Sequence, residues 1–440
     1  MHPKRSATLP IIIAGLALLA LYIRLAFITN AVDEVSLYLS IFGIAFAIYL
    51  FCLYWTRRTR PDGKSIWLIL GFALAFRVVF IGVWPSISTD FYRYVWDGHV
   101  AKAGINPYAY PPNDRELKHL RTDYWRRLSY KRWQTPYPPG AQLVFKTAYK
   151  LKPDSQIPLK ATFILFDMAT ILLLLRLLGA LGLPRSWLIV YAWSPLIVTE
   201  FASSGHVDAM GVMAMTLALT LSVTQGRKSV SGPAALAWSA ALKPFAIPLI
   251  PMFVRRHGWK ALVAGAVVLL ALIAPYAGHW REILATPQSM AKETHVNTSL
   301  FNVFEMIGDW FGADPGAFAR AAGGLLVACF ALWPALRGKT DDKRLLNSAM
   351  ATVGVTLLVS PLVYPWYTAW IIPFLCFSLN PAWLLFTGLV AVSYLLPFYE
   401  WALWIRLVQY VPFYGILLAV GVWRRRRAVS SSEHAASGRP

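Results

Sequence analysis

The sequence contains few cysteines and few acidic residues. Only three cysteines occur among its 440 residues, and all three lie inside hydrophobic runs (Cys52, Cys329 and Cys376). Disulfide frameworks and zinc sites need cysteines in pairs or clusters, so neither is expected here. Charged residues make up 14% of the chain, and Lys and Arg outnumber Asp and Glu by 42 to 21. An internal repeat is also missing, which counts weakly against the inverted-repeat architecture of many transporters.

Long hydrophobic runs dominate the chain, and 57% of its residues are hydrophobic. About 20 apolar residues cross a bilayer as a helix, because a helix satisfies its own backbone hydrogen bonds. Barrel strands would show alternating polarity instead of continuous runs. We therefore predict an all-α integral membrane protein, a polytopic bundle of about 12–14 transmembrane helices. The runs are 9–29, 36–56, 66–84, 157–181, 186–203, 206–224, 259–276, 317–336, 344–361, 366–379, 381–397 and 402–423.

The net charge of +21 would suggest nucleic-acid binding in a soluble protein. Here much of the basic charge lies in short loops beside helix ends, which is the pattern of cytoplasmic loops. These basic clusters are 2–5, 57–60, 227–228, 255–256 and 424–427. We therefore predict no nucleic-acid partner, cytoplasmic N- and C-termini and a multi-pass protein of the plasma (inner) membrane.

The same orientation divides the chain into regions. Residues 1–423 are expected to form a single transmembrane domain, and 85–156 a large extracytoplasmic loop with amphipathic helices. Long loops cross membranes largely regardless of charge, so the basic residues of this loop do not oppose that assignment. The first hydrophobic run lacks a cleavage motif and is followed by many others, so we interpret it as a retained helix. The Ser-, Ala- and charge-rich segment 424–440 is predicted to be a disordered cytoplasmic tail.

One hydrophobic segment, 232–254, does not fit simple alternation. Basic clusters flank it on both sides, and both clusters are expected to be cytoplasmic. Lys243 and Pro244 occupy its middle, and Pro248 and Pro251 follow. Proline interrupts helices, and an ionisable group at membrane depth usually faces protein or water. We predict a re-entrant pair of short helices with Lys243 near the apex; a proline-kinked full span is the alternative.

Unusual polar residues collect on the predicted outer side. Polar residues placed at random would divide between the two faces, so this distribution favours an extracytoplasmic active site. The outer set comprises Asp90, Arg93, Asp97, His206, Asp208 and the segment 360–367, which includes Tyr364 and Trp366.

Several of these residues also have a purely structural interpretation. Asp90 follows Ser88 and Thr89 and would suit the first turn of a helix. Arg93 and Asp97 have the spacing of a helical ion pair.

Structural interpretations extend to the other outer residues. His206 and Asp208 would suit a helix start, and the Pro-Trp-Tyr cluster would suit packing between helices. The aromatic residues of 85–140 would suit an interfacial belt. Lys243 has the weakest structural explanation, because an unpaired buried ammonium is costly.

A carboxylate beside cationic side chains suits sugar transfer. A sugar hydroxyl that attacks an anomeric carbon needs a base, and Asp90 is our candidate. Arg, Lys or protonated His would stabilise a phosphate leaving group. Direct displacement with inversion needs a single base, whereas a retaining hydrolase needs two carboxylates about 5 Å apart. Asp90 and Asp97 are two helical turns apart, about 10 Å, which disfavours that pair.

Six sequence motifs together resemble a known family, the bacterial polyprenyl-phosphate-mannose-dependent mannosyltransferases of the GT-C membrane class. The first-loop motifs are the most specific. The motifs are TDFYRYVWDG at 89–98, AGINPY at 103–108, YPPGAQ at 137–142, GHVD at 205–208, LKP at 242–244 and SPLVYPWY at 360–367.

The resemblance implies a lipid-linked phosphosugar donor, an inverting mechanism and a catalytic aspartate in the first large outer loop, where Asp90 lies. The partners it implies are a polyprenyl-phosphate-linked sugar, a glycolipid or glycan acceptor and membrane lipids. Members often carry histidine where this chain has Tyr364, and a phenol cannot become cationic. Candidate donor or substrate contacts are Arg93, Asp97, His206, Asp208, Lys243, Tyr364 and Trp366.

Two questions stay open at this point. We expect no cofactor, although carboxylates on the outer side leave a divalent metal possible in principle. The alternative function is a membrane transporter or lipid flippase with a polar path through Asp90 and Lys243. Such a protein should place its binding residues at the midplane, with gates on both sides.

Overall fold

The computed structural model describes residues 8–59, 63–337, 341–399 and 403–437. Within these ranges all regular secondary structure is helical, and one isolated β-bridge joins Val296 to Leu362. The predicted all-α class is therefore confirmed.

In the first half the α-helices are α1 (Thr8–Ala26), α2 (Val35–Thr59), α3 (Gly63–Val78), α4 (Asp90–Lys102), α5 (Pro139–Leu151), α6 (Ile157–Ala180), α7 (Ile189–Ala192), α8 (Pro195–Ile197) and α9 (Asp208–Thr224). In the second half they are α10 (Ser231–Leu242), α11 (Ile250–His257), α12 (Lys260–Ile273), α13 (Trp280–Glu293), α14 (Leu300–Trp310), α15 (Pro315–Leu336), α16 (Asp342–Leu358), α17 (Pro365–Thr368), α18 (Ile372–Leu375), α19 (Pro381–Leu389) and α20 (Leu403–Ser437).

Long apolar helices make this a multi-pass membrane protein. In the part of the chain that the structure describes, seven helical segments are long and apolar enough to cross a bilayer. The remaining predicted spans are shorter helices, such as α3, α9 and α16, or broken ones. The seven are Thr8–Ala26, Val35–Thr59, Ile157–Ala180, Lys260–Glu293, Pro315–Leu336, Pro381–Phe398 and Leu403–Trp423.

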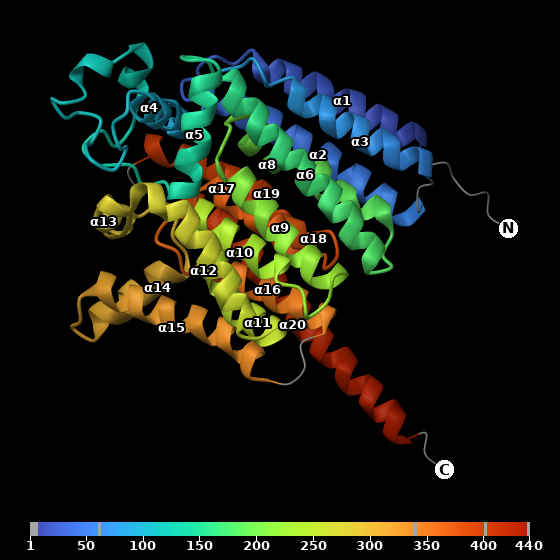
Figure 1. Ribbon diagram of the computed structural model, residues 1–440. Helices are drawn as coiled ribbons and strands as arrows, with labels where there is room; N and C mark the ends of the chain where they lie inside the picture. The colour runs from blue at the N-terminus through green and yellow to red at the C-terminus, as the bar shows by residue number, and fades with distance from the viewer. Residues whose placement is uncertain (1–7, 60–62, 338–340, 400–402, 438–440) are drawn as a thin grey trace.

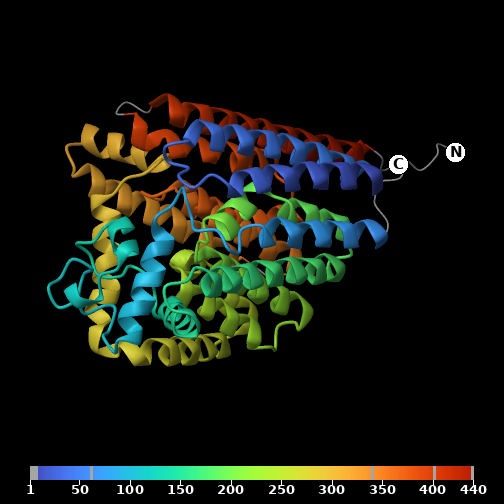
Figure 2. The ribbon, with the colours of Figure 1, turned by 90° about the horizontal axis from the view of Figure 1, so that it is seen from above.

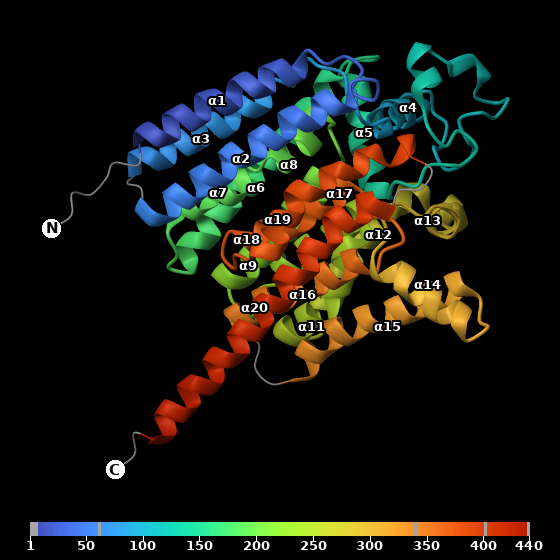
Figure 3. The same cartoon turned by 180° about the vertical axis from the view of Figure 1, so that it is seen from behind.

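The long helices α1, α2, α3 and α6 run along a similar axis (Figure 1). Figure 2 shows α4 and the loop around it at one end of the bundle, and the start of α1 and the end of α20 at the other. Seen from behind, α13 and α14 lie at the same end as α4 (Figure 3). The start of α1 and the end of α20 thus lie on one side, as the basic loops predict; which side of the membrane this is stays a prediction.

The predicted span 186–203 is not one continuous helix in the structure. Pro195 begins a new short helix after Ser194, and the chain then widens into a π-helix over Val198–Ser203. Gly205 follows with φ of 68°, a conformation that favours glycine. Irregular backbone at membrane depth is tolerated where it is buried in protein. The break is followed by His206 and Asp208, whose contacts are described below.

The segment 232–254 forms the predicted re-entrant hairpin. Helix α10 ends at Lys243, whose backbone is extended, and α11 returns after a 3-10 turn. At the end of α11, His257 Nε2 lies 3.0 Å from Ser222 Oγ. Gly232, at the start of α10, packs against the same hydroxyl. Because both ends of the segment meet one residue of α9, it enters and leaves on the same side, and the kinked-span alternative is wrong.

The predicted disordered tail differs from the structure. Helix α20 continues to Ser437, so the backbone over 424–437 is helical, while 438–440 lie outside the described residues. Arg, Ala and Glu favour helix, and neither Gly nor Pro occurs between Trp423 and Ser437. Composition predicted disorder because it measures the lack of apolar residues and not helix propensity.

Candidate active site

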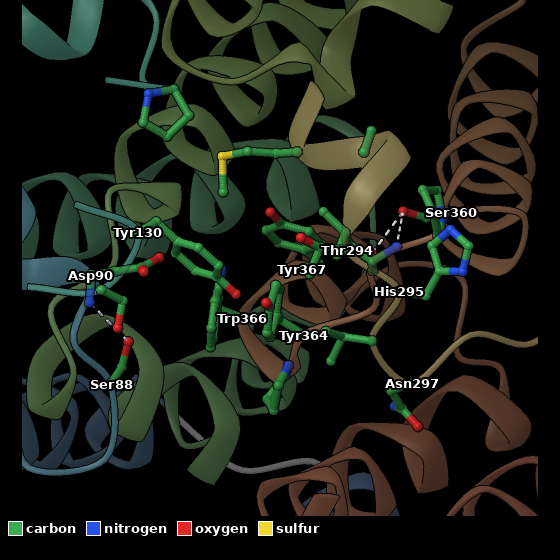
Figure 4. A pocket seen from close by; sticks show the side chains of 18 of the residues that line it. Ser88, Asp90, Tyr130, Thr294, His295, Asn297, Ser360, Tyr364, Trp366 and Tyr367 are labelled. Carbon is green, nitrogen blue, oxygen red and sulfur yellow. Dashed lines mark hydrogen bonds between the residues drawn. The ribbon is translucent and has the colours of Figure 1, made fainter. Parts of the chain in front are cut away.

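A cavity of about 1050 Å³ lies where several parts of the chain converge, among them residues between Ser393 and Arg406. Its walls come from the start of α4, the loop 129–138, the apex of the α10–α11 hairpin, the segment 287–297 and the segment 360–367. Ligand pockets of drug-sized molecules span about 300–1,000 Å³, so this one has room for a sugar and part of a second substrate. Figure 4 shows Ser88 and Asp90 at one end of it and His295 and Ser360 at the other.

Asp90 is the first residue of α4, where the helix dipole favours a negative charge. Its backbone N–H donates to Ser88 Oγ at 3.3 Å. Among the described residues, no side chain or backbone group bonds to its carboxylate, and it is the one carboxylate that lines the cavity. Asp90 therefore lies at a helix start, as its structural interpretation expected, and it also presents an unbonded carboxylate to the cavity.

Arg93 and Asp97 form the helical pair that their spacing predicted. Arg93 Nε lies 2.8 Å from Asp97 Oδ1, and both side chains are buried. Gln142 donates to the other carboxylate oxygen at 3.1 Å, and Arg93 also donates to the Trp133 carbonyl at 3.2 Å. Arg93 lines the cavity whereas Asp97 does not. Asp97 therefore holds the arginine in place from behind.

Lys243 reaches the cavity from the apex of the hairpin. Its Nζ lies 3.1 Å from Asp208 Oδ2, and Trp370 Nε1 donates to Asp208 Oδ1 at 2.8 Å. The ammonium also lies 4.7 Å from the centroid of the Tyr367 ring. Asp208 is fully buried behind the cavity wall. The carboxylate compensates a charge that would be costly unpaired at membrane depth.

His206 lies behind the wall rather than on it. Its Nδ1 is 3.1 Å from Glu200 Oε2, its Nε2 is 3.0 Å from Ser88 Oγ, and the ring is fully buried. The Tyr394 hydroxyl donates to the Glu200 carboxylate at 2.8 and 3.0 Å. Sequence reasoning missed Glu200, although a carboxylate within a hydrophobic run is itself a signal of a functional or paired site.

Aromatic rings form part of the wall. Trp366 stacks on His206 with centroids 4.0 Å apart, and Tyr364 stacks on Trp366 at 4.4 Å. Tyr364 and Trp366 both line the cavity, so the cluster serves packing and also faces the interior. Burial raises the pKa of the Tyr364 hydroxyl well above its ordinary value, so it remains a neutral donor. Tyr130 and Trp133 form a second stacked pair at 5.4 Å.

Two further basic residues line the cavity. They are His295, whose Nδ1 lies 3.4 Å from Glu305, and Arg406 from α20. Neither was among the predicted contacts. The described residues contain no group of three or more His, Cys, Asp and Glu side chains that would hold a metal ion. The expectation that the protein uses no cofactor stays a prediction.

The structure thus separates the predicted site residues into two layers. Those on the cavity wall are Asp90, Arg93, Lys243, Tyr364 and Trp366. Those behind the wall, each bonded to a wall residue or stacked on one, are Asp97, His206 and Asp208.

The family model described as alpha-(1->6)-mannopyranosyltransferase, N-terminal domain, matches residues 13–257, which is more than half of the chain. The chain belongs to this family. The resemblance to mannosyltransferases that the motifs indicated is thereby confirmed.

Two known proteins are similar to this member of the family. Alpha-(1->6)-mannopyranosyltransferase A of Mycobacterium tuberculosis is 26% identical over 321 residues, which is 65% of this chain and 60% of that protein. The chain therefore spans less than two thirds of the length of this relative. The crystal structure of ArnT from Cupriavidus metallidurans bound to undecaprenyl phosphate matches with a TM-score of 0.47 and 15% identity, over 76% of this chain and 61% of that one. A similarity at this level carries no conclusion about substrate or site.

Proposed function

We propose that this protein transfers mannose from a polyprenyl-phosphate donor to a hydroxyl group of a glycolipid or glycan acceptor. Membership of the mannosyltransferase family supports the reaction class. The observation that carries the mechanism is the unpartnered Asp90 carboxylate, the one acid on the cavity wall among the described residues. The neighbouring acids Asp97, Asp208 and Glu200 are all engaged by protein partners.

Asp90 acts as the general base in this proposal. Its carboxylate takes the proton of the acceptor hydroxyl as that oxygen attacks the anomeric carbon and the phosphate leaves. A retaining double displacement would need a second carboxylate about 5 Å away, and the described wall offers none. The single acid therefore supports direct displacement with inversion of the anomeric configuration.

Lys243 and Arg93 meet the charge that develops on the leaving phosphate. Each is already paired with a buried carboxylate, so the two ion pairs add no net charge to the cavity before a substrate binds. The same carboxylates hold the two cations at fixed positions. Preorganised donors of this kind stabilise a transition state without having to reorganise. The neutral hydroxyl of Tyr364 adds a hydrogen-bond donor where many relatives would place histidine.

The cavity wall also includes apolar side chains that suit a polyprenyl chain. They come from α13 and from the end of the chain around α20, and include Pro287, Met290, Ala291, Leu396, Pro397 and Leu403. The start of α4, which lines the cavity, lies at the end of the bundle opposite the start of α1 and the end of α20 (Figure 2). In this proposal that end faces the extracytoplasmic side, as the basic loops predict. A transporter or flippase is not favoured, because the family is one of sugar transferases.

The test is a transfer assay with the purified protein in liposomes. Polyprenyl-phosphate-mannose should donate its sugar to a mannose-containing acceptor, and nucleotide-linked mannose should not. NMR of the new linkage should show the anomeric configuration opposite to that of the donor. Retention of configuration would refute the single-base mechanism, and the absence of transfer from any lipid-linked sugar would refute the proposed activity.

A further inference from the structure

Ser88 presents a hydroxyl group to the cavity two residues before Asp90. It is 8% exposed, and it lines the cavity. A hydroxyl oxygen has one donor and two acceptor directions. His206 Nε2 takes one of these at 3.0 Å, and the Asp90 N–H takes another at 3.3 Å. One direction is left for a ligand in the cavity.

The orientation of the His206 ring is fixed from the far side. Its Nδ1 faces two acceptors of Glu200, the backbone carbonyl and Oε2, both at 3.1 Å. Nδ1 therefore carries a hydrogen, and Nε2 is the atom that faces Ser88. Tyr394 holds the Glu200 carboxylate by donating to both of its oxygens. Trp366 covers one face of the imidazole at 4.0 Å, so the ring cannot tilt freely.

Neither His206 nor Glu200 reaches the cavity, because both side chains are essentially inaccessible. A buried carboxylate and imidazole are costly unless each is paired, so their burial here calls for a structural or functional reason. Two cavity-lining hydroxyl groups bond to this pair, that of Tyr394 to Glu200 and that of Ser88 to His206. Of the two, the Ser88 hydroxyl also bonds to the backbone of the residue proposed as the base.

We propose that Ser88 binds a sugar hydroxyl beside Asp90, and that the buried His206–Glu200 pair is a positioning unit that fixes the direction of the Ser88 hydroxyl. Its described partners, His206 Nε2 and the Asp90 N–H, leave one direction of the Ser88 oxygen open, and a sugar hydroxyl can bond there because it both donates and accepts. The inference rests on the proposed function and deepens it by assigning a second substrate contact at the start of α4.

Two substitutions of Ser88 test the contact. Ser88→Ala should lower kcat/KM for transfer about tenfold, the upper range for one lost neutral hydrogen bond. Ser88→Thr keeps a hydroxyl and should recover most of the activity. Ser239→Ala is the matched control, since that buried hydroxyl donates to the Gly211 carbonyl at 2.8 Å away from the cavity wall. Its transfer rate should equal that of the wild type.

The positioning role is tested by a double-mutant cycle. His206→Phe keeps an aromatic ring against Trp366 but cannot bond to Ser88 or Glu200. If His206 acts through Ser88, Ser88→Ala combined with His206→Phe should be no less active than His206→Phe alone. Losses that simply multiply would overturn the positioning role. Should His206→Phe fail to fold, His206→Asn takes its place in the same cycle.

Deoxy substrates show which sugar Ser88 binds. Wild-type transfer should fall about tenfold with one particular deoxy analogue, and Ser88→Ala should transfer that analogue as well as the natural substrate. Deoxy acceptors and deoxymannosyl donors are assayed separately, so the result shows whether Ser88 binds the acceptor or the donor sugar.

Two results would overturn the inference. Equal activity of Ser88→Ala and the wild type on every substrate would remove Ser88 from the site and leave the proposed function intact. A wild type that transfers from no lipid-linked sugar would overturn the proposed function and this inference with it.

Discussion

Replacing Asp208 by Asn leaves the Lys243 ammonium without its buried counter-charge. In the wild type, Lys243 Nζ lies 3.1 Å from Asp208 Oδ2, and the two side chains are 11% and 0% exposed. Removing one partner of a buried ion pair costs about 3–5 kcal/mol, because an uncompensated charge remains in a medium of low dielectric. We therefore expect Asp208→Asn to lower the free energy of unfolding by about 3–5 kcal/mol. Asn still offers an acceptor to Trp370, so the loss reports on the charge.

The double variant Asp208→Asn/Lys243→Met separates stability from function. An apolar side chain of similar length removes the unpaired charge, so most of the lost stability should return. Transfer should not return, because the donor phosphate has lost its cation. The assay is denaturant unfolding in one detergent, together with transfer rates at equal amounts of folded protein. Asp208→Asn as stable as the wild type, or full transfer by the double variant, would refute the reasoning.

Three further substitutions probe the cavity wall. Tyr364→Phe should raise the KM for the lipid-linked donor about fivefold, the worth of roughly one neutral hydrogen bond, and an unchanged KM would remove the phenol from the site. Asp97→Asn should lower stability by about 3–5 kcal/mol and reduce transfer, since it leaves Arg93 unpaired; wild-type unfolding curves would contradict this. Gly205→Ala should destabilise by at least about 1–3 kcal/mol in unfolding assays, because φ is 68° and the new Cβ would lie 2.7 Å from the Phe91 ring. A Gly205→Ala variant as stable as the wild type would show that the backbone at this turn adjusts to the new side chain without a measurable cost.

Charge patterning predicted more of the topology than hydrophobicity did. The basic residues around 232–254 required both ends of that segment on one side. In the structure the segment turns back after Lys243, so that both of its ends meet Ser222 of α9. Hydropathy alone would have counted a further span there. Hydropathy also missed the break over 198–205, because the mean hydropathy of a sequence window does not register a π-helix or a glycine turn.

The sequence did not predict which polar residues line the cavity and which lie behind its wall. Asp90 and Asp97 belong to the same helix, yet one faces the cavity and the other faces Arg93 and Gln142. Which carboxylate stays free depends on α5, which supplies Gln142 from a different part of the chain. Glu200 was missed for a similar reason, since one of its partners, Tyr394, lies on a distant segment. Motif spacing finds candidate residues, and only tertiary packing divides them into wall and support.

The most direct test of the account compares wild type and Asp90→Asn in transfer from polyprenyl-phosphate-mannose under single-turnover conditions. The substitution keeps the size of the side chain and removes its basicity. Loss of a general base should slow the chemical step about 10²–10⁴-fold, while donor binding stays close to the wild-type value. An Asp90→Asn variant that transfers mannose at the wild-type rate would contradict the central claim and leave Asp90 as a residue of the helix start.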